Sequence, residues 1–283
     1  MNSKTMAVRL GLARGRIELR QTFLNAQDLW GYLFPAVVFL VVLIFMRNAR
    51  VPGTQFSLGA QTLPSVIGMN VAFVGLMSMA ALLSIEREDG TLLRAKATPN
   101  GMLAYLVGKI VVVAGMSIVT VLLILVPGAF ILDGLALDSV GAWFTLIWVM
   151  VLGLVATLPV GAIFGSWMKS PRNMGLVMLP LLGLFAISGI FYPLGSLPGW
   201  VQGIAQMFPV YWLGLGMRSA LLPADLAAVE IGGSWRHLET LGVLSVWVVI
   251  GLAFAPIVLR RMARRESGSQ VAARREAAMQ RVT

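Results

Sequence analysis

The chain has 283 residues, of which 58% are hydrophobic and only 12% are charged, about half the charged fraction of an ordinary soluble protein. This composition indicates a membrane protein, and the absence of cysteine excludes disulfides, thiolate chemistry and cysteine-ligated metals. The net charge of +10 does not indicate nucleic-acid binding, because the charges lie between apolar runs and at both ends of the chain, as in loops at an anionic membrane face.

Residues 1–29 are predicted to form an amphipathic connecting helix on the cytoplasmic membrane surface. Its apolar residues recur on one side at helical spacing: Met6, Leu10, Ala13, Ile17 and Leu24. Its cations are Lys4, Arg9, Arg14, Arg16 and Arg20. A basic tail that only sets the topology is an equally open alternative. Because no small-residue cleavage site follows the first apolar run, we expect a retained helix and not a signal peptide.

Six apolar runs follow that are long enough to cross a bilayer, which needs about 20 helical residues. They lie near 30–46, 63–85, 102–126, 140–168, 174–194 and 239–259, within a transmembrane domain spanning 30–259. The fourth run is overlong and contains Pro159, which suggests a kink or a tilt. Gly161 and Gly165 in that run permit a close helix approach, although such pairs are common in glycine-rich chains.

The distribution of Lys and Arg predicts the orientation. All but four of the 22 fall on one side of the membrane, and the exceptions are Arg47, Arg50, Arg218 and Arg236. The positive-inside rule then places both termini in the cytoplasm, including a basic tail at 260–283. Only an even number of spans gives this split.

A short polar segment at 84–105 separates the second and third runs. Gly90 suits the left-handed conformation that commonly closes a helix, and Thr91 suits the N-cap of a short helix over 92–97. Thr98 followed by Pro99 then predicts the cap and first turn of the next helix. We expect a cytosolic coupling helix that a soluble partner could grip.

Between the fifth and sixth runs, residues 191–212 mix proline and glycine with apolar and aromatic residues. This segment is too broken to span and too apolar to be solvated, which favours short re-entrant helices at the outer interface. Trp200, Tyr211 and Trp212 are then expected at headgroup level. A surface hairpin without function is the alternative.

The interiors of the six runs lack Asp, Glu, Arg and His, which argues against a proton- or sodium-coupled carrier. Lys109 lies about two turns into the third run and is expected to snorkel to the cytoplasmic surface. His237, Asp133 and Asp138 are expected to be solvated, with no metal site. A solute path would be lined by Asn70, Ser78, Ser117, Thr120, Thr145, Thr157 and Ser188. Such a lining suits a bulky amphipathic or lipophilic substrate, although helix-packing hydrogen bonds are the better explanation for each of these residues taken singly.

Two stretches together resemble a known family. They are Glu86-Arg-Glu-Asp-Gly-Thr91 with Thr98-Pro99 and Gly108-Lys109, and Ser188-Gly-Ile-Phe-Tyr-Pro193 with Leu197-Pro-Gly-Trp200 and Pro209. In this order they resemble the ABC-2 type permeases, the membrane subunits of type V ABC exporters, and most nearly the daunorubicin-resistance and lipo-oligosaccharide export branch. Tyr192 departs from the pattern, which has another Phe there.

The resemblance implies a permease without catalytic residues, cofactor or metal of its own. Two permease subunits, identical or related, would join two ATP-binding cassette subunits that carry ATP and Mg²⁺. It assigns the ATPase contact to Glu86, Arg87, Glu88, Gly90, Thr91 and Arg94. It assigns the outer gate to Phe191, Tyr192, Pro193, Trp200, Tyr211 and Trp212.

The implied function is ATP-driven export of an amphipathic or lipophilic substrate from the cell membrane, either a drug or antibiotic or a lipid or glycolipid. One rival is an ATP-independent channel or facilitator, in which the 84–105 segment would tolerate charge reversal. The other is an intramembrane lipid enzyme, which would need His, Asp or Glu at membrane depth.

Overall fold

The computed structural model describes residues 3–50, 56–88, 90–168 and 174–265, and these residues form helices and turns without a β-strand. The longer helices are α1 (Ser3–Leu24), α2 (Ala26–Met46), α3 (Leu58–Phe73), α6 (Gly101–Ile131), α7 (Val140–Trp167), α8 (Met174–Ile187), α10 (Pro209–Leu221) and α11 (His237–Arg265). The shorter elements are the π-helix η1 (Val74–Ser78), α4 (Met79–Glu88), which continues η1, α5 (Thr91–Lys96), η3 (Leu194–Ser196), α9 (Gly199–Met207), η4 (Ala224–Val229) and η5 (Ile231–Gly233). The predicted all-α membrane fold is confirmed.

Among the described residues, five helices are long and apolar enough to cross a membrane: α2, the continuous α3–η1–α4, α6, α7 and α11. The fifth predicted run, 174–194, is represented by α8, which has 14 residues and at 1.5 Å per residue is shorter than the bilayer core. Its helix ends at Ile187, and Gly189 follows with φ of 69°. The prediction that this run continues as a helix to residue 194 is therefore wrong, and the count of six spans stays a prediction.

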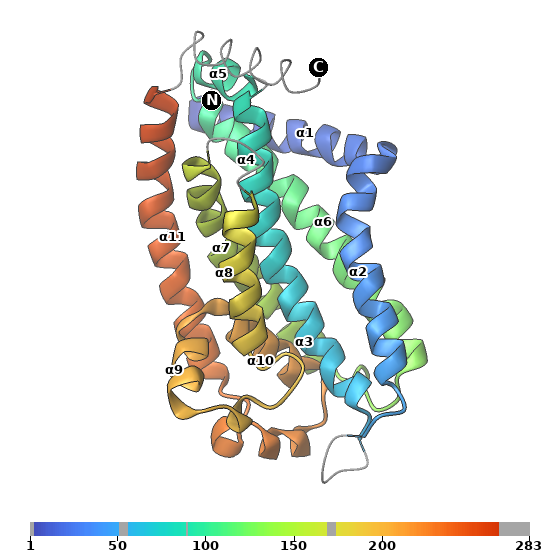
Figure 1. The fold of residues 1–283 in the computed structure, drawn as a ribbon. Helices are drawn as coiled ribbons and strands as arrows, with labels where there is room; N and C mark the ends of the chain where they lie inside the picture. The colour runs from blue at the N-terminus through green and yellow to red at the C-terminus, as the bar shows by residue number, and fades with distance from the viewer. Residues whose placement is uncertain (1–2, 51–55, 89, 169–173, 266–283) are drawn as a thin grey trace.

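The two ends of the bundle differ (Figure 1). The α5 end carries α5, the crosswise helix α1 and the C-terminal end of α11, whereas the α9 end carries α9 and α10. α1 and the last described turn of α11 thus lie at the same end, as an even number of crossings requires.

The helix α3–η1–α4 runs through the middle of the bundle, and most of its side chains are buried. A Cβ added to Gly161 of α7 would lie 2.5 Å from the carbonyl oxygen of Leu76, and one added to Gly165 would lie 2.8 Å from that of Ala80. The Gly161/Gly165 pair therefore makes the close helix contact that its spacing permits.

The N-terminal segment is helical, and it is attached through small residues. Ala7, Gly11 and Gly15 form its buried face, and a Cβ added to Gly11 would lie 2.6 Å from the carbonyl oxygen of Ala104 in α6. The apolar residues predicted for one face of this helix are all exposed, so they remain available to a membrane surface. α2 begins at Ala26, before the predicted boundary at residue 30.

The α9 end is more deeply packed than the sequence suggests. Trp200 on α9 is 71% exposed, but Tyr211 and Trp212 on α10 are 0% and 2% exposed. Their side chains therefore do not face the headgroups, because α10 packs among α3, α7 and α11 inside the bundle; their depth in the membrane stays a prediction. The α3–α10 contact is close enough that a Cβ added to Gly68 would lie 2.7 Å from the Gly214 nitrogen.

Candidate functional site

The connection between α4 and α6 has most of the predicted local structure. Gly90 adopts φ of 80°, the left-handed conformation expected there. α5 begins at Thr91, so Thr91 is its first residue and not its N-cap, and the Thr91 hydroxyl accepts a 3.0 Å hydrogen bond from Arg94 Nη2. Arg94 is exposed, whereas Leu92 and Ala95 are buried. α5 therefore presents a polar surface while its apolar side is attached to the bundle.

The predicted start of the next helix is wrong by two residues. α6 begins at Gly101, preceded by Asn100 at φ of 55°. Thr98 does not cap α6, because its hydroxyl donates to the carbonyl of Ala95 at 3.0 Å and so closes α5. The two left-handed residues, Gly90 and Asn100, thus bracket α5 as a separate unit.

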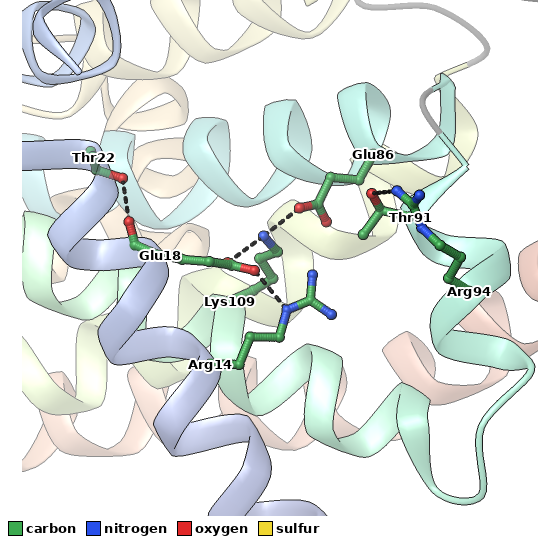
Figure 2. Close-up of polar contacts among 7 residues, drawn as sticks. All are labelled: Arg14, Glu18, Thr22, Glu86, Thr91, Arg94 and Lys109. Atoms are coloured by element: carbon green, nitrogen blue, oxygen red, sulfur yellow. Dashed lines mark hydrogen bonds and ion pairs between the residues drawn. The ribbon is translucent and has the colours of Figure 1, made fainter. Parts of the chain in front are cut away.

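A partly buried cluster of charges, with Lys109 at its centre, lies close to α5 (Figure 2). Lys109 of α6 donates to Glu18 of α1 at 2.6 Å and also to Glu86 of α4. Arg14 Nε donates to the other carboxylate oxygen of Glu18 at 2.7 Å. We call Arg14, Glu18, Glu86 and Lys109 the Lys109 cluster. It joins α1, α4 and α6 at one point.

Lys109 is 3% exposed, so the expectation that it snorkels to the surface is wrong. Its charge is balanced inside the protein, because the cluster contains two cations and two carboxylates. The ring of Tyr105 lies beside both cations, with its centroid 5.6 Å from Arg14 Cζ and from Lys109 Nζ. Glu86 Oε2 is buried and has no hydrogen-bond partner among the described residues.

The electrostatics of Glu18 follow from these contacts. Partial burial acts to raise the pKa of Glu18, but hydrogen bonds from Lys109 and Arg14 outweigh it and hold the pKa below its usual value. The same ion pair raises the pKa of Arg14 against the opposing effect of burial. Glu18 is therefore a carboxylate whose charged form holds α1 against α6.

The family model described as ABC-2 family transporter protein matches residues 48–257. This chain belongs to the ABC-2 transporter family. It is a multi-pass membrane permease subunit of an ABC transporter, and membership implies association with an ATP-binding subunit. A comparison with curated proteins gave no match. The matched range contains Glu86 and Lys109 of the permease but not Arg14 and Glu18.

The predicted ATPase contact of the permease lies together at the α5 end. Glu86 belongs to the Lys109 cluster, and Gly90, Thr91 and Arg94 form the start of α5. The side chains of Arg87 and Glu88 lie outside the described part of the structure. Sequence reasoning missed Glu18 and the pairing of Lys109, although an isolated lysine within an apolar run is a signal that partners must exist.

The predicted gate residues of the permease occupy three separate elements. Phe191, Tyr192 and Pro193 form the turn after α8, Trp200 lies on α9, and Tyr211 and Trp212 lie on α10. The Tyr192 hydroxyl donates to the carbonyl of Ala186. Trp212 is held by a 2.6 Å hydrogen bond from its indole nitrogen to the carbonyl of Gln206. The role of this set as a gate stays a prediction.

The predicted path residues do not line one cavity. Asn70, Ser117 and Thr120 meet between α3 and α6, where the Thr120 hydroxyl donates to Asn70 Oδ1 at 2.7 Å. Ser188 donates to the carbonyl of Phe185 at 2.7 Å, and Ser78 lies on η1. An apolar cavity of about 520 Å³ lies elsewhere, between α7, α8, α10 and α11, and Thr157 contributes a hydroxyl to its lining.

Proposed function

We propose that this permease is the membrane subunit of an ATP-driven exporter, and that α5 is the surface on which the ATP-binding subunit docks. The observation that carries the proposal is the Lys109 cluster. It connects the helix leading to α5 with α1, the second element at the same end. A displacement of α5 by a partner would therefore be passed from α4 through Glu86 and Lys109 to α6 and α1.

The route from α5 to the membrane interior is a single helix. α4 continues through η1 into α3, and Leu76 of η1 lines the cavity of about 520 Å³. π-helical turns inside an α-helix occur frequently at functional sites, because they leave backbone groups in a less regular arrangement. Nucleotide binding by the partner would favour one arrangement of this helix over another, which is the energetic content of coupling.

The lining of the cavity supports a lipophilic or amphipathic substrate. Its described lining residues carry no charged side chain, and aromatic residues such as Phe164, Phe208 and Trp247 contribute to its walls. Efflux of a drug or antibiotic is our first choice, as in the daunorubicin branch that the sequence resembles, and a lipid or glycolipid is the second. The working assembly would contain two permease chains and two ATP-binding subunits, which bind ATP and Mg²⁺.

The test is co-purification with the ATP-binding subunit encoded nearest to this gene, followed by ATPase measurements across a panel of amphipathic compounds. Gly90→Pro cannot adopt φ of 80°, because proline fixes φ near −65°. We expect this variant to insert in the membrane, but the amphipathic compounds should no longer stimulate the ATPase activity of the partner subunit.

The matched control is Gly232→Pro, which changes a glycine of nearly the same φ, 77°, in the loop between α10 and α11. It should retain co-purification with the ATP-binding subunit. Transport by the permease without any ATP-binding subunit would instead support an ATP-independent channel and refute the proposal.

A further inference from the structure

A second buried ion pair lies near the α9 end of the molecule. Arg218, on the last turn of α10, donates from Nε to Glu230 Oε1 at 2.6 Å and from Nη2 to Glu230 Oε2 at 3.0 Å. Its Nη1 donates to the hydroxyl of Ser65 in α3 at 2.8 Å. The side chains of Arg218 and Glu230 are only 4% and 7% exposed. We call Ser65, Arg218 and Glu230 the Arg218 cluster.

The Arg218 cluster connects three segments: the end of α10, the loop that follows it, and α3, which lies 153 residues from Arg218 in the sequence. Glu230 lies between η4 and η5, so its carboxylate ties that outer loop to the end of α10. Ser65 ties the same guanidinium to the central helix α3. A guanidinium presents donors in a planar fork, and a two-pronged contact with one carboxylate fixes both its distance and its orientation. The three segments are therefore held in one relative position.

The Arg218 cluster stands directly behind the turn after α8. A gap of about 10 Å³ is lined by Thr62, Ser65, Arg218 and Glu230 on one side and by Phe191, Tyr192 and Pro193 on the other. So small a space holds about one water molecule and no solute. The turn that the resemblance assigns to the outer gate thus leaves no room for a solute between itself and a buried ion pair.

We propose that Arg218 is a positioning residue that keeps this end of the transport path closed through its ion pair with Glu230. The inference rests on the proposed function, because it treats the path as an export route with an exit at the α9 end. An ion pair in a dry site is strong, and water that enters as the gap widens solvates both ions and offsets the loss of the pair. The proposal gives the cluster two arrangements: the paired one that the structure shows, and an open one in which water separates the two ions.

Single-cysteine labelling tests the proposal, because the chain has no cysteine of its own. Thr62 lines the gap and is 2% exposed, so the thiol introduced by Thr62→Cys should react slowly with a membrane-impermeant maleimide in vesicles that contain the permease alone. Adding Glu230→Gln removes the negative charge from the Arg218 cluster. We expect labelling to become at least about tenfold faster, equivalent to about 1.4 kcal/mol in the opening equilibrium.

The matched control is Glu239→Gln, the same change in the exposed ion pair of Arg236 and Glu239, whose nearest atoms are 3.3 Å apart. It should leave the labelling of the thiol in the Thr62→Cys protein unchanged. Trp200→Cys, at a 71% exposed position on α9, should react rapidly in every background and shows that the reagent reaches this end. Equal labelling rates of the Thr62→Cys thiol in the Glu230→Gln and Glu239→Gln backgrounds would overturn the proposal.

Two milder variants keep the test decisive if Glu230→Gln does not fold. Arg218→Lys retains the charge but loses the fork, and Ser65→Ala loses only the bond from Nη1. Both should speed the labelling of the Thr62→Cys thiol, and Arg218→Lys should do so more; unchanged rates in both would refute the role of Arg218. Adding the ATP-binding subunit and ATP to the Thr62→Cys protein with Arg218 and Glu230 intact then tests coupling separately. The labelling of the permease alone needs no nucleotide.

Discussion

The Lys109 cluster and the Arg218 cluster lie at opposite ends of the molecule, and they neutralise a buried cation in different ways. Each places one buried cation on a helix and neutralises it with carboxylates from other elements. Lys109 shares its ammonium between two carboxylates on α1 and α4, whereas Arg218 gives its fork to a single carboxylate and one hydroxyl. A compact charge on a flexible stem can follow either partner, and a planar fork cannot.

This difference suits the two positions. Where a soluble subunit is expected to push, a mobile ammonium lets α1 and α4 shift without breaking the ion pair. Where a path must stay sealed, the two-pronged contact of Arg218 with Glu230 permits one geometry and loses two hydrogen bonds together when it opens. The comparison predicts that removing either cation is costly, but that exchanging one cation type for the other affects the two ends unequally.

The largest effect is expected from Lys109→Met. Lys109 is 3% exposed, and removing it leaves Glu86 and Glu18 without their shared cation, a change that costs about 3–5 kcal/mol in comparable buried pairs. We expect a large drop in Tm of the purified permease. Ile110→Met is the control, because its side chain is 45% exposed one residue along the same helix. Equal Tm values for the two variants would show that the Lys109 cluster contributes nothing to the fold.

A smaller effect is expected from Glu18→Gln, which keeps the shape of the side chain but loses its charge. The bonds from Lys109 and Arg14 weaken, by about 1 kcal/mol in total after allowing for the partial exposure of Glu18. We expect faster tryptic cleavage within α1, measured under native conditions with the bundle intact. Asp28→Asn, an equivalent change at an exposed acid in α2, should leave the cleavage rate of α1 unaltered.

The same attachment should depend on pH, with a sign fixed by the lowered pKa of Glu18. A depressed pKa means that the stabilisation is fully present above the ordinary value and is lost as the pH falls through the lower one. We expect α1 to be held at neutral pH and to be held less tightly as the pH falls below the ordinary pKa of a glutamate. Amide hydrogen exchange of α1, corrected for the intrinsic pH dependence, measures this. Glu18→Gln should abolish the transition, and a transition that persists would assign it to another group.

The sequence was sufficient for much of the fold because the bilayer constrains the elements. Apolar runs of fixed length became α2, α3–η1–α4, α6, α7 and α11, and the left-handed conformation of Gly90 followed from the chemistry of helix ends. Hydropathy does not distinguish burial in lipid from burial in protein. For this reason the composition of the segment predicted that Tyr211 and Trp212 face the headgroups, although both side chains are buried inside the bundle.

The charged clusters escaped prediction for a different reason. Lys109 is 91 residues from Glu18 and 23 from Glu86 in the sequence, so no local pattern pairs them. The count of Lys and Arg assigned Arg218 to the outer side of the membrane. The structure places it on α10, which folds into the bundle and brings its side chain to Ser65, 153 residues away. In both cases the residue type was visible and its partners were not, because the partners are fixed by how the helices pack.

The smallest effect is expected from exchanging the two cation types, in Lys109→Arg and Arg218→Lys. Both variants keep the charge, so they test the difference between the two clusters most directly. Lys109→Arg introduces extra donors beside Glu86 Oε2, which has no partner among the described residues, and a new bond there offsets the larger volume. Arg218→Lys has no such compensation, since an ammonium cannot reproduce the paired contact with both oxygens of Glu230. We expect Arg218→Lys to lower the stability by about 1 kcal/mol more than Lys109→Arg does. Tm measured on both variants under one condition decides this, and a larger loss for Lys109→Arg would mean that the ammonium at the α5 end is held as rigidly as the guanidinium of Arg218.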